Sequence, residues 1–294
     1  MSKEYGNQNG RCVLALQFNN IDFLIIGAGK SATTWLQIQL QAHPDVYMVD
    51  PELHYFSREY HRGADWYLSQ FSGEGIGKTV GEKSNSYLDD PESAGRIHRV
   101  LPDAKLIAQL RNPVERAYSH YCMMFNRGEV GPDIENHLDP SRLKDERILD
   151  IGNYSAHLSR YLDLFGGEKV LILFFEGVAQ DPESQMSRVR AHLGLKPRPL
   201  ATTASKKVKD KAAMRVPNSV RDRLGWMKPI VRPLRGTGAF ETVRNAIASE
   251  VEYPPLTDDL RERLNDYFAP SISALEEMSG QSLRHWNRPM VRSH

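Results

Sequence analysis

Short apolar runs alternate along the chain with longer stretches in which apolar residues recur every three or four positions. Each apolar run predicts a buried strand, and these runs are residues 21–26, 105–110 and 170–175. Helical spacing predicts amphipathic helices at residues 33–41, 113–125, 153–164, 182–193 and 257–278. Strands that alternate with helices favour a single α/β domain with a mainly parallel sheet flanked by helices.

Two long polar stretches interrupt this pattern. Residues 126–152 are polar and irregular, and they predict a loop with little core. Residues 201–249 are poorly patterned and strongly basic from Lys206 to Arg244. Because loops on a rigid scaffold commonly carry specificity, we expect both stretches to line a ligand cleft. We expect residues 1–20 to form an N-terminal tail before a domain of residues 21–294.

The first chemical signal is the segment FLIIGAGKSATTWL, residues 23–36. An apolar run enters a turn that contains Gly29, and the next helix opens with Lys30, Ser31, Ala32, Thr33 and Thr34. Backbone N–H groups at a helix start are unpaired, and the helix dipole favours negative charge there. The segment therefore predicts a site for a phosphate-like group.

The ATP- and GTP-binding version of this turn is G-x-x-x-x-G-K-[ST]. Gly29, Lys30 and Ser31 satisfy its second half, but Leu24 stands where the first glycine is required. The loop is therefore too short to wrap a triphosphate in the usual way. A P-loop kinase that uses ATP and Mg²⁺ stays open as an alternative, as does a nucleotide-binding protein without catalysis.

The second signal is AKLIAQLRNPVERAYSHY, residues 104–121. The predicted strand ends at Arg111, Asn112 is a good N-cap, and Glu115 has the spacing of a capping box. Ser119 follows about two turns into the helix. Ligands of open α/β sheets lie beyond the carboxyl ends of the strands, and a guanidinium group suits a terminal phosphate.

Together these motifs resemble the sulfotransferases that use 3′-phosphoadenosine 5′-phosphosulfate (PAPS), over roughly residues 21–210. The resemblance implies that the turn from Gly29 to Thr34 binds the 5′-phosphosulfate. It also implies that Arg111 and Ser119 bind the 3′-phosphate, which the product PAP retains. That family usually has glycine where this chain has Ala32, so residue 32 is expected not to need a positive φ.

A third stretch, PELHYFS at residues 51–57, resembles the heparan-sulfate type of this family. The resemblance implies that Glu52 is the catalytic base and that His54 lies beside it, on the same side of an extended segment. Lys83, in VGEKSNSYL, is implied to lie near the sulfate and the acceptor. Glu82 is the alternative base. Tyr154, Lys206 and Lys207 are further residues that the resemblance implies for the cofactor.

The reaction that this resemblance implies is sulfuryl transfer from PAPS to an acceptor hydroxyl of a carbohydrate, glycoconjugate or natural product. Glu52 would take the hydroxyl proton, and Lys30 would stabilise the charge on the leaving group. The scheme requires no metal, and the sequence has no His/Cys/Asp cluster at ligand spacing.

Composition limits the partners. A formal net charge of +1 predicts no global attraction to nucleic acid or to membranes. The sequence has no apolar run of 18 residues and no signal-peptide pattern, so we expect no membrane span. Its two cysteines, Cys12 and Cys122, do not make a disulfide framework. These observations predict a cytoplasmic enzyme, and they leave its oligomeric state open.

Overall fold

The computed structural model describes residues 16–143, 146–201, 214–215 and 249–287. Its centre is a five-stranded sheet in the order β2-β3-β1-β4-β5, in which every pairing is parallel. The strands are β1 (Phe23–Gly27), β2 (Val46–Met48), β3 (Thr79–Lys83), β4 (Lys105–Leu110) and β5 (Val170–Phe174). The predicted parallel α/β fold is therefore confirmed.

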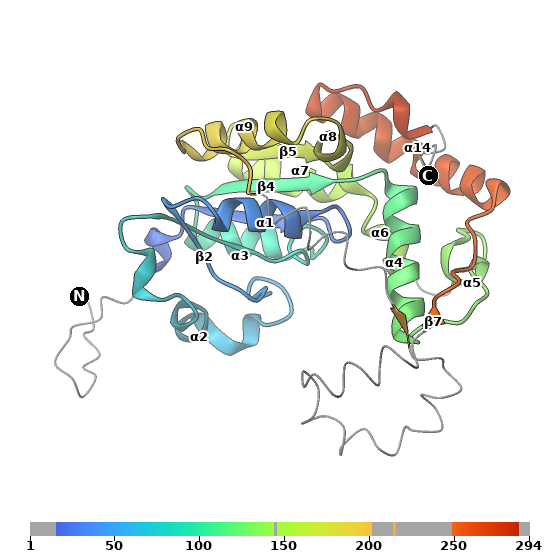
Figure 1. Ribbon diagram of the computed structural model, residues 1–294, viewed down its shortest axis with the longest axis horizontal. Coiled ribbons are helices and arrows are strands. Elements are labelled where there is room, and N and C mark those ends of the chain that lie inside the picture. Colours follow the sequence, from blue (N-terminus) through green and yellow to red (C-terminus); the bar gives the residue numbers. More distant parts are fainter. Residues whose placement is uncertain (1–15, 144–145, 202–213, 216–248, 288–294) are drawn as a thin grey trace, which may run out of the picture.

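Helices cover both faces of the sheet, as Figure 1 shows. Alternate residues of β1 point to opposite faces, so Phe23 and Ile25 join one core cluster while Leu24 and Ile26 join the other. The first face is covered by α1 (Thr33–Gln41) and α9 (Pro182–Leu193). The second is covered by α3 (Ser93–Val100) and α7 (Tyr154–Phe165). The helices predicted at these places, other than α3, are confirmed to within one residue.

Two long helices lie at the carboxyl end of the sheet. α4 (Pro113–Arg127) begins directly after β4 and crosses the sheet end (Figure 1), and α14 (Asp258–Ser279) packs on α4 and α7. Both were predicted within two residues of their ends. Apart from two short helices within residues 126–152, the remaining described elements are η1 (Phe18–Asn20), η2 (Tyr60–Arg62), α2 (Gly63–Ser69), η3 (Gly73–Gly75), α8 (Phe175–Gln180), β6 (Met214–Arg215), β7 (Ser249–Glu250) and η6 (Arg284–Asn287).

The strands β2 and β3 were not predicted. β3 has the sequence TVGEK, in which Val80 is the one strongly apolar residue, and β2 has three residues. Packing explains why β3 nevertheless lies inside the sheet. A Cβ atom at Gly81 would lie 2.5 Å from the ring of Phe23, so the absence of a side chain lets that ring cover the strand. Tertiary contacts, rather than local strand preference, make this element.

The prediction that residues 126–152 form a loop with little core is wrong. Two short helices form there, α5 (Glu135–Leu138) and α6 (Arg147–Asp150). Ile134, Leu138 and Leu149 are buried in the main core cluster, with exposed fractions of 8%, 0% and 0%. A four-residue helix is too short to produce a recognisable period, so the apolar residues were hidden among polar ones.

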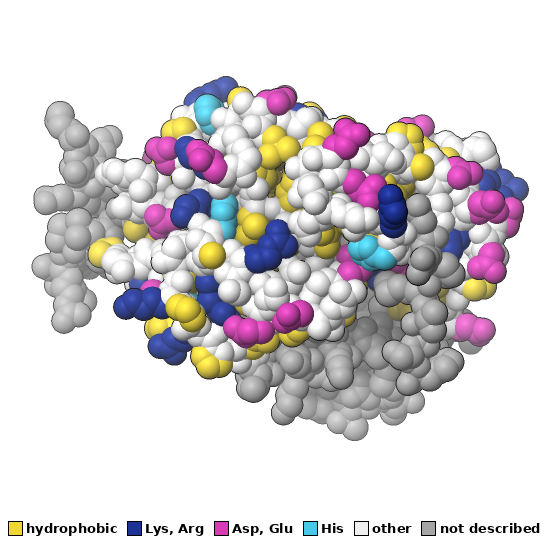
Figure 2. All heavy atoms as spheres, turned by 90° about the horizontal axis from the view of Figure 1, so that it is seen from above, with side chains coloured by type: hydrophobic (Ala, Val, Ile, Leu, Met, Phe, Trp, Pro, Cys, Tyr) yellow, Lys and Arg dark blue, Asp and Glu magenta, His cyan; other side chains and the backbone are white. Residues whose placement is uncertain are grey.

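The boundary of the N-terminal tail is also corrected. η1 forms at Phe18–Asn20, and Leu16 is 5% exposed within the main core cluster, so the packed domain begins before residue 21. Apart from its first residue, Ala201, the strand β6 and the first residue of β7, the stretch 201–249 lies outside the described residues. On the face shown in Figure 2, described basic and acidic side chains are interspersed, in agreement with the formal net charge of +1.

Candidate active site

The turn after β1 has an unusual backbone that brings three segments together. Gly27 has φ +150°, and a Cβ atom there would lie 2.9 Å from Cβ of Leu88 and 3.0 Å from the Asn85 carbonyl oxygen. Glycine at this position therefore lets the segment after β3 approach the turn closely. The N–H of Ala28 donates to the Gln109 carbonyl at 2.8 Å, which fixes the turn against β4.

The expectation that residue 32 does not need a positive φ, because alanine stands there instead of glycine, is wrong. Ala32 has φ +63° and ψ +26°, in the left-handed region, and it is the N-cap of α1. Such a conformation costs an L-residue roughly 1–2 kcal/mol, which glycine would avoid. The chain needs this turn to change from the left-handed backbone of Lys30, with φ +71°, into the helix. The position therefore has the geometry that suits the glycine usual in the resembled family.

Polar groups around this turn have unused hydrogen-bonding capacity. Ser31 is fully buried, and within the described part of the chain its Oγ has no hydrogen-bond partner. The Nε of Arg111 is likewise buried without a partner among the described residues. No described side chain caps the N-terminus of α1. Donors left in this state around one helix start fit a bound phosphate or sulfate group, as predicted for the turn.

Arg111 lies where the second motif predicted it, directly after β4 and beside the turn. Its Nη1 donates to the Lys30 carbonyl at 3.3 Å, and its guanidinium lies 4.7 Å from the ring centroid of Phe175. The Tyr154 hydroxyl donates to the Arg111 carbonyl at 2.9 Å. Burial raises the pKa of Tyr154 to about 12, so this hydroxyl stays a neutral donor. Ser119 is half-buried on α4.

The start of α4 has the predicted N-cap but not the predicted capping box. Asn112 is the N-cap, and its side chain accepts from the N–H groups of Val114 and Glu115 at 2.9 and 3.4 Å. Glu115 does not close a capping box. It pairs with Arg261 of α14 at 2.6 Å, while the Asn112 N–H donates to Glu176 at 3.0 Å. Long-range partners replace the local one because α14 and α8 pack around this end of α4.

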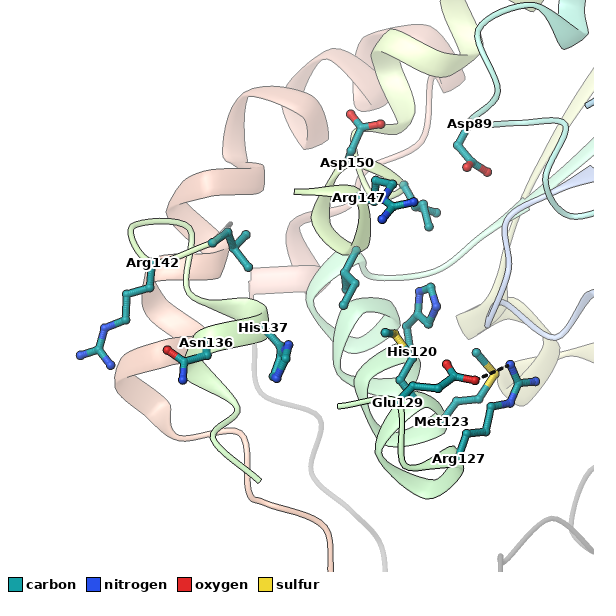
Figure 3. A pocket seen from close by; sticks show the side chains of 14 residues that line it. Asp89, His120, Met123, Arg127, Glu129, Asn136, His137, Arg142, Arg147 and Asp150 are labelled. Atoms are coloured by element: carbon teal, nitrogen blue, oxygen red, sulfur yellow. Dashed lines mark ion pairs between the residues drawn. The ribbon is translucent and has the colours of Figure 1, made fainter. Parts of the chain in front are cut away.

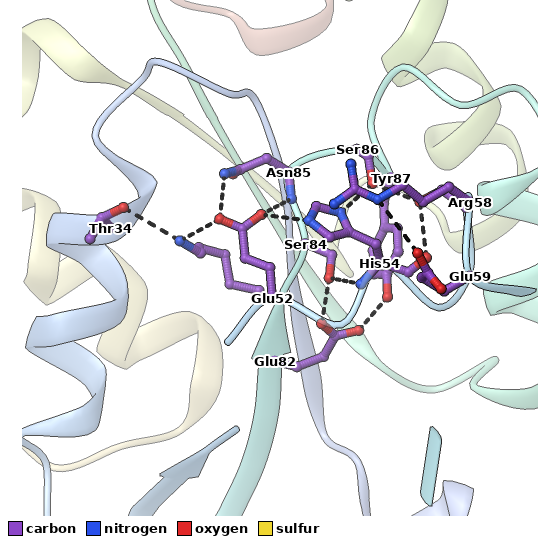
Figure 4. A network of polar contacts seen from close by, with 12 residues as sticks. Thr34, Glu52, His54, Arg58, Glu59, Glu82, Ser84, Asn85, Ser86 and Tyr87 are labelled. Atoms are coloured by element: carbon purple, nitrogen blue, oxygen red, sulfur yellow. Dashed lines mark hydrogen bonds and ion pairs between the residues drawn. The ribbon is translucent and has the colours of Figure 1, made fainter. Parts of the chain in front are cut away.

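A polar network surrounds Glu52, which is 26% exposed (Figure 4). Its Oε1 lies 2.9 Å from Lys83 Nζ and accepts from Asn85 Nδ2 at 3.0 Å. Its Oε2 accepts from the Asn85 N–H at 3.1 Å. Lys83 Nζ also donates to Thr34 Oγ1 at 3.4 Å, so one lysine connects the carboxylate with the first turn of α1. Lys83 itself is 4% exposed.

His54 lies beside Glu52, with Nε2 3.5 Å from Oε2, as the two-residue spacing predicted. The segment is not a regular strand, however, since His54 has φ +52° and its N–H donates to Ser84 Oγ at 2.8 Å. Its Nδ1 is 2.7 Å from Ser86 Oγ. Burial, with a smaller effect of the Arg58 charge, lowers the pKa of His54, so the imidazole is neutral at pH 7.

Glu82 is connected to His54 through Ser84, whose Oγ accepts from the His54 N–H and donates to Glu82 (Figure 4), but it points away from Glu52 and Lys83. Alternation along β3 sends Lys83 toward α1 and Glu82 into the opposite core, where Glu82 is 0% exposed. There it accepts from Tyr87 at 2.6 Å, from Ser84 at 2.7 Å and from Tyr67 at 3.3 Å. Burial raises the pKa of Glu82 to about 7. A cavity of about 420 Å³ opens beside Glu52, His54 and Lys83, and Glu82 does not line it.

Sequence reasoning missed Asn85 and Ser86, which orient Glu52 and His54. The signal available was the polar run after Lys83, but nothing in it indicated which side chains turn inward. Lys206 and Lys207 lie outside the described residues. Within the described residues no group of three or more His, Cys, Asp and Glu side chains could hold a metal ion. Likewise, no helix in the described part of the chain is long and apolar enough to span a membrane.

A parallel sheet whose carboxyl end carries a lysine-bearing turn at a helix start defines an α/β protein that binds phosphate- or sulfate-bearing ligands. The model of the sulfotransferase domain family matches residues 20–276, and the chain belongs to that family.

Curated relatives of this chain have names that contain heparan sulfate. The chain is 35% identical over 178 residues to human heparan sulfate glucosamine 3-O-sulfotransferase 6. This match covers 59% of this chain and 52% of that relative. It is 33% identical over 197 residues to human bifunctional heparan sulfate N-deacetylase/N-sulfotransferase 3, covering 60% of this chain and 22% of that protein. The chain thus spans about half the length of the 3-O-sulfotransferase and less than a quarter of the length of the bifunctional relative.

A solved structure shares the fold. The sulfotransferase from Alicyclobacillus acidocaldarius superimposes with a TM-score of 0.64 at 25% identity, and the match covers 91% of this chain and 99% of that one. The family and this structure agree with the predicted sulfotransferase resemblance, and neither supports the kinase alternative.

Proposed function

We propose that this chain is a PAPS-dependent sulfotransferase that transfers a sulfuryl group to a hydroxyl of a carbohydrate-containing acceptor. The observation that carries the proposal is the position of Lys83 Nζ, 2.9 Å from Glu52 and 3.4 Å from Thr34. The side chain of Lys83 thereby contacts both Glu52, the candidate base, and the first turn of α1, where the anion would bind. Membership of the sulfotransferase family supports the same reaction.

The donor would be bound by the turn from Gly29 to Thr34 and by Arg111 and Ser119. PAPS supplies an activated sulfuryl group whose leaving group is adenosine 3′,5′-bisphosphate (PAP). Ser31 Oγ and Arg111 Nε, buried without described partners, are donors suited to its anionic groups. Tyr154 would contribute indirectly, because its hydroxyl fixes the backbone of Arg111 through a 2.9 Å hydrogen bond to the Arg111 carbonyl.

Glu52 would accept the proton of the attacking hydroxyl. Asn85 holds both carboxylate oxygens, at 3.0 and 3.1 Å, so one orientation is favoured before the acceptor arrives. Neutral His54 would support that orientation from the other side. Lys30 and Lys83 would stabilise the negative charge that develops near the turn, since fixed cations in a partly buried site need no reorganisation.

The acceptor class follows from the names of the relatives, which contain heparan sulfate and, in several cases, glucosamine. We infer a sugar hydroxyl from this similarity. The cytoplasmic location predicted from the sequence stays a prediction.

Isothermal titration with PAP, and in parallel with ATP and Mg²⁺, tests the donor. We expect PAP to bind, and Arg111→Ala to raise its Kd about 10–100-fold, because a hydrogen bond to a charged group contributes ~1.5–3 kcal/mol. The matched control is Arg99→Ala, an exposed arginine of α3 on the second face of the sheet. Binding of ATP with PAP silent would contradict the proposal and favour the kinase, whereas PAP binding without product from any acceptor would favour a non-catalytic nucleotide-binding protein.

A further inference from the structure

A second and larger cavity, of about 790 Å³, lies between α4, α5, α6 and the segment after β3 (Figure 3). Its volume is within the range typical of small-molecule sites. Five of its lining residues are apolar: Met123, Met124, Leu143, Ile148 and Ile151. Most of its wall comes from the stretch that the sequence had predicted to be a loop lining a cleft.

This cavity adjoins the candidate active site at two points. His120 lines it and directly follows Ser119 on α4, and the charge of Lys30 is among the influences that lower the pKa of His120 to about 4. Asp89 lines it as well, and it ends the short segment whose Asn85 contacts Glu52. The wall of the cavity and the partner of Glu52 thus belong to one short segment, residues 85–89, along which a ligand with its sugar at Glu52 would extend to fill the cavity.

The charges of the lining are balanced. Three arginines, Arg127, Arg142 and Arg147, face three carboxyl residues, Asp89, Glu129 and Asp150. Arg127 pairs with Glu129 at 3.9 Å, and Arg142 pairs with Glu135 at 2.6 Å. Burial and neighbouring cations lower the pKa of His120, so it adds no charge at pH 7. A polyanion needs an excess of cations, which the described lining does not supply.

The apolar part of the wall suits a different ligand. Methionine side chains are unbranched and polarizable, so Met123 and Met124 can adapt to an irregular apolar group. Burying such a group is favourable in proportion to the apolar area removed from water.

We propose that this cavity binds an apolar aglycone, so that the chain prefers an uncharged alkyl or aryl glycoside to a sulfated polysaccharide. This inference rests on the proposed function, because the sugar hydroxyl is taken to lie at Glu52. It departs from the relatives, whose names specify heparan sulfate.

The test measures binding to the PAP-saturated protein by titration calorimetry. The probes are methyl β-glucoside, octyl β-glucoside below its micellar concentration, and a sulfated heparin tetrasaccharide. Octyl glucoside should bind at least about tenfold more tightly than methyl glucoside, since burying two of the additional methylene groups suffices for that factor. The tetrasaccharide should bind more weakly than octyl glucoside.

The variants Met123→Gln and Met124→Gln keep side-chain length and helix preference while they add polarity to the wall. Each should remove most of the octyl advantage and leave PAP affinity unchanged. Met278→Gln, at a 39% exposed position on α14, is the matched control and should keep the advantage.

Equal binding of the methyl and octyl glucosides, absent binding of both, or tightest binding of the tetrasaccharide would each overturn the inference. An octyl advantage that survives in both pocket variants would do so as well. Failure of the proposed function is distinguishable, because in the preceding experiments either PAP itself would not bind, or PAP would bind and no acceptor would yield a product.

Discussion

The donor side and the acceptor side of this site are built in different ways. The donor side is a continuous segment, the turn from β1 into α1, with one arginine from the neighbouring strand. The acceptor side is assembled from Glu52, which follows β2, and from Lys83 and Asn85, at and after the end of β3; Lys83 connects it to Thr34 of the donor turn. A contiguous segment has its geometry set locally, whereas an assembled cluster depends on the packing that brings its members together.

Glu52→Gln should have the largest effect on the acceptor side. The variant loses the proton acceptor, so we expect turnover to fall about 10²–10⁴-fold, as is typical when a general base is removed. PAP affinity, measured by titration, should change little because the carboxylate is not part of the turn. Unchanged turnover in Glu52→Gln, with turnover lost in Glu82→Gln, would transfer the role of base to Glu82.

Lys30→Ala tests the donor side in the same assay. Loss of a cation at the developing charge should reduce turnover about 10²–10³-fold, with a smaller effect on PAP affinity. Lys169→Ala is the matched control, since Lys169 pairs with Asp103 at 2.9 Å, at the opposite end of the sheet. If Lys30→Ala weakens PAP binding as much as turnover, Lys30 binds the donor without selective stabilisation of the transition state.

Glu82, the carboxylate that does not face the cavity, should have a measurable effect on the stability of the fold. Its pKa is about 7 in the folded chain against an ordinary value of 4.5, so the folded state binds the proton more tightly. The resulting stabilisation is present below about pH 4.5 and is lost as the pH rises through about 7. This stabilisation contributes on the order of 3 kcal/mol to the free energy of unfolding.

Denaturant unfolding between these pH values would measure that contribution. The wild type should lose stability relative to Glu82→Gln as the pH rises, because the neutral amide cannot ionise. Glu74→Gln, an exposed carboxyl in η3, should keep the wild-type slope. Parallel curves for the wild type and Glu82→Gln would show that burial does not shift the pKa of Glu82.

The smallest expected effect concerns the backbone of the turn. Ala32→Gly relieves the left-handed conformation at φ +63°, so we expect the free energy of unfolding to rise by about 0.5–1 kcal/mol. Ala156→Gly, at an exposed position within α7, should instead lower it by about 1 kcal/mol. A loss of stability in Ala32→Gly similar to that in Ala156→Gly would argue against strain at residue 32.

Several features were predictable because they depend on neighbours in sequence. The strand β1, the following turn and α1 follow from one apolar run, two glycines and a helical period. Arg111 was predicted beside the turn because parallel strands end at one edge of the sheet, and its 3.3 Å contact with the Lys30 carbonyl confirms this. The parallel α/β fold follows from the same alternation of elements.

Other features depend on contacts between distant segments, and the sequence could not decide them. Whether Glu52 or Glu82 faces the cavity was undecided, because the choice depends on which side of β3 Glu82 takes and on how the segment after β2, which carries Glu52, packs beside it. The strand β3 itself exists through the packing of Phe23 on Gly81. The short helices α5 and α6 form against α4 and against each other, and α5 also against α14, without a periodic signal of their own. The sequence by itself determined the fold class and the anion-binding turn, since local hydrogen bonding and alternation suffice for both. The tertiary structure decided which carboxylate is accessible and what lines the larger cavity, since burial is a property of the assembled chain.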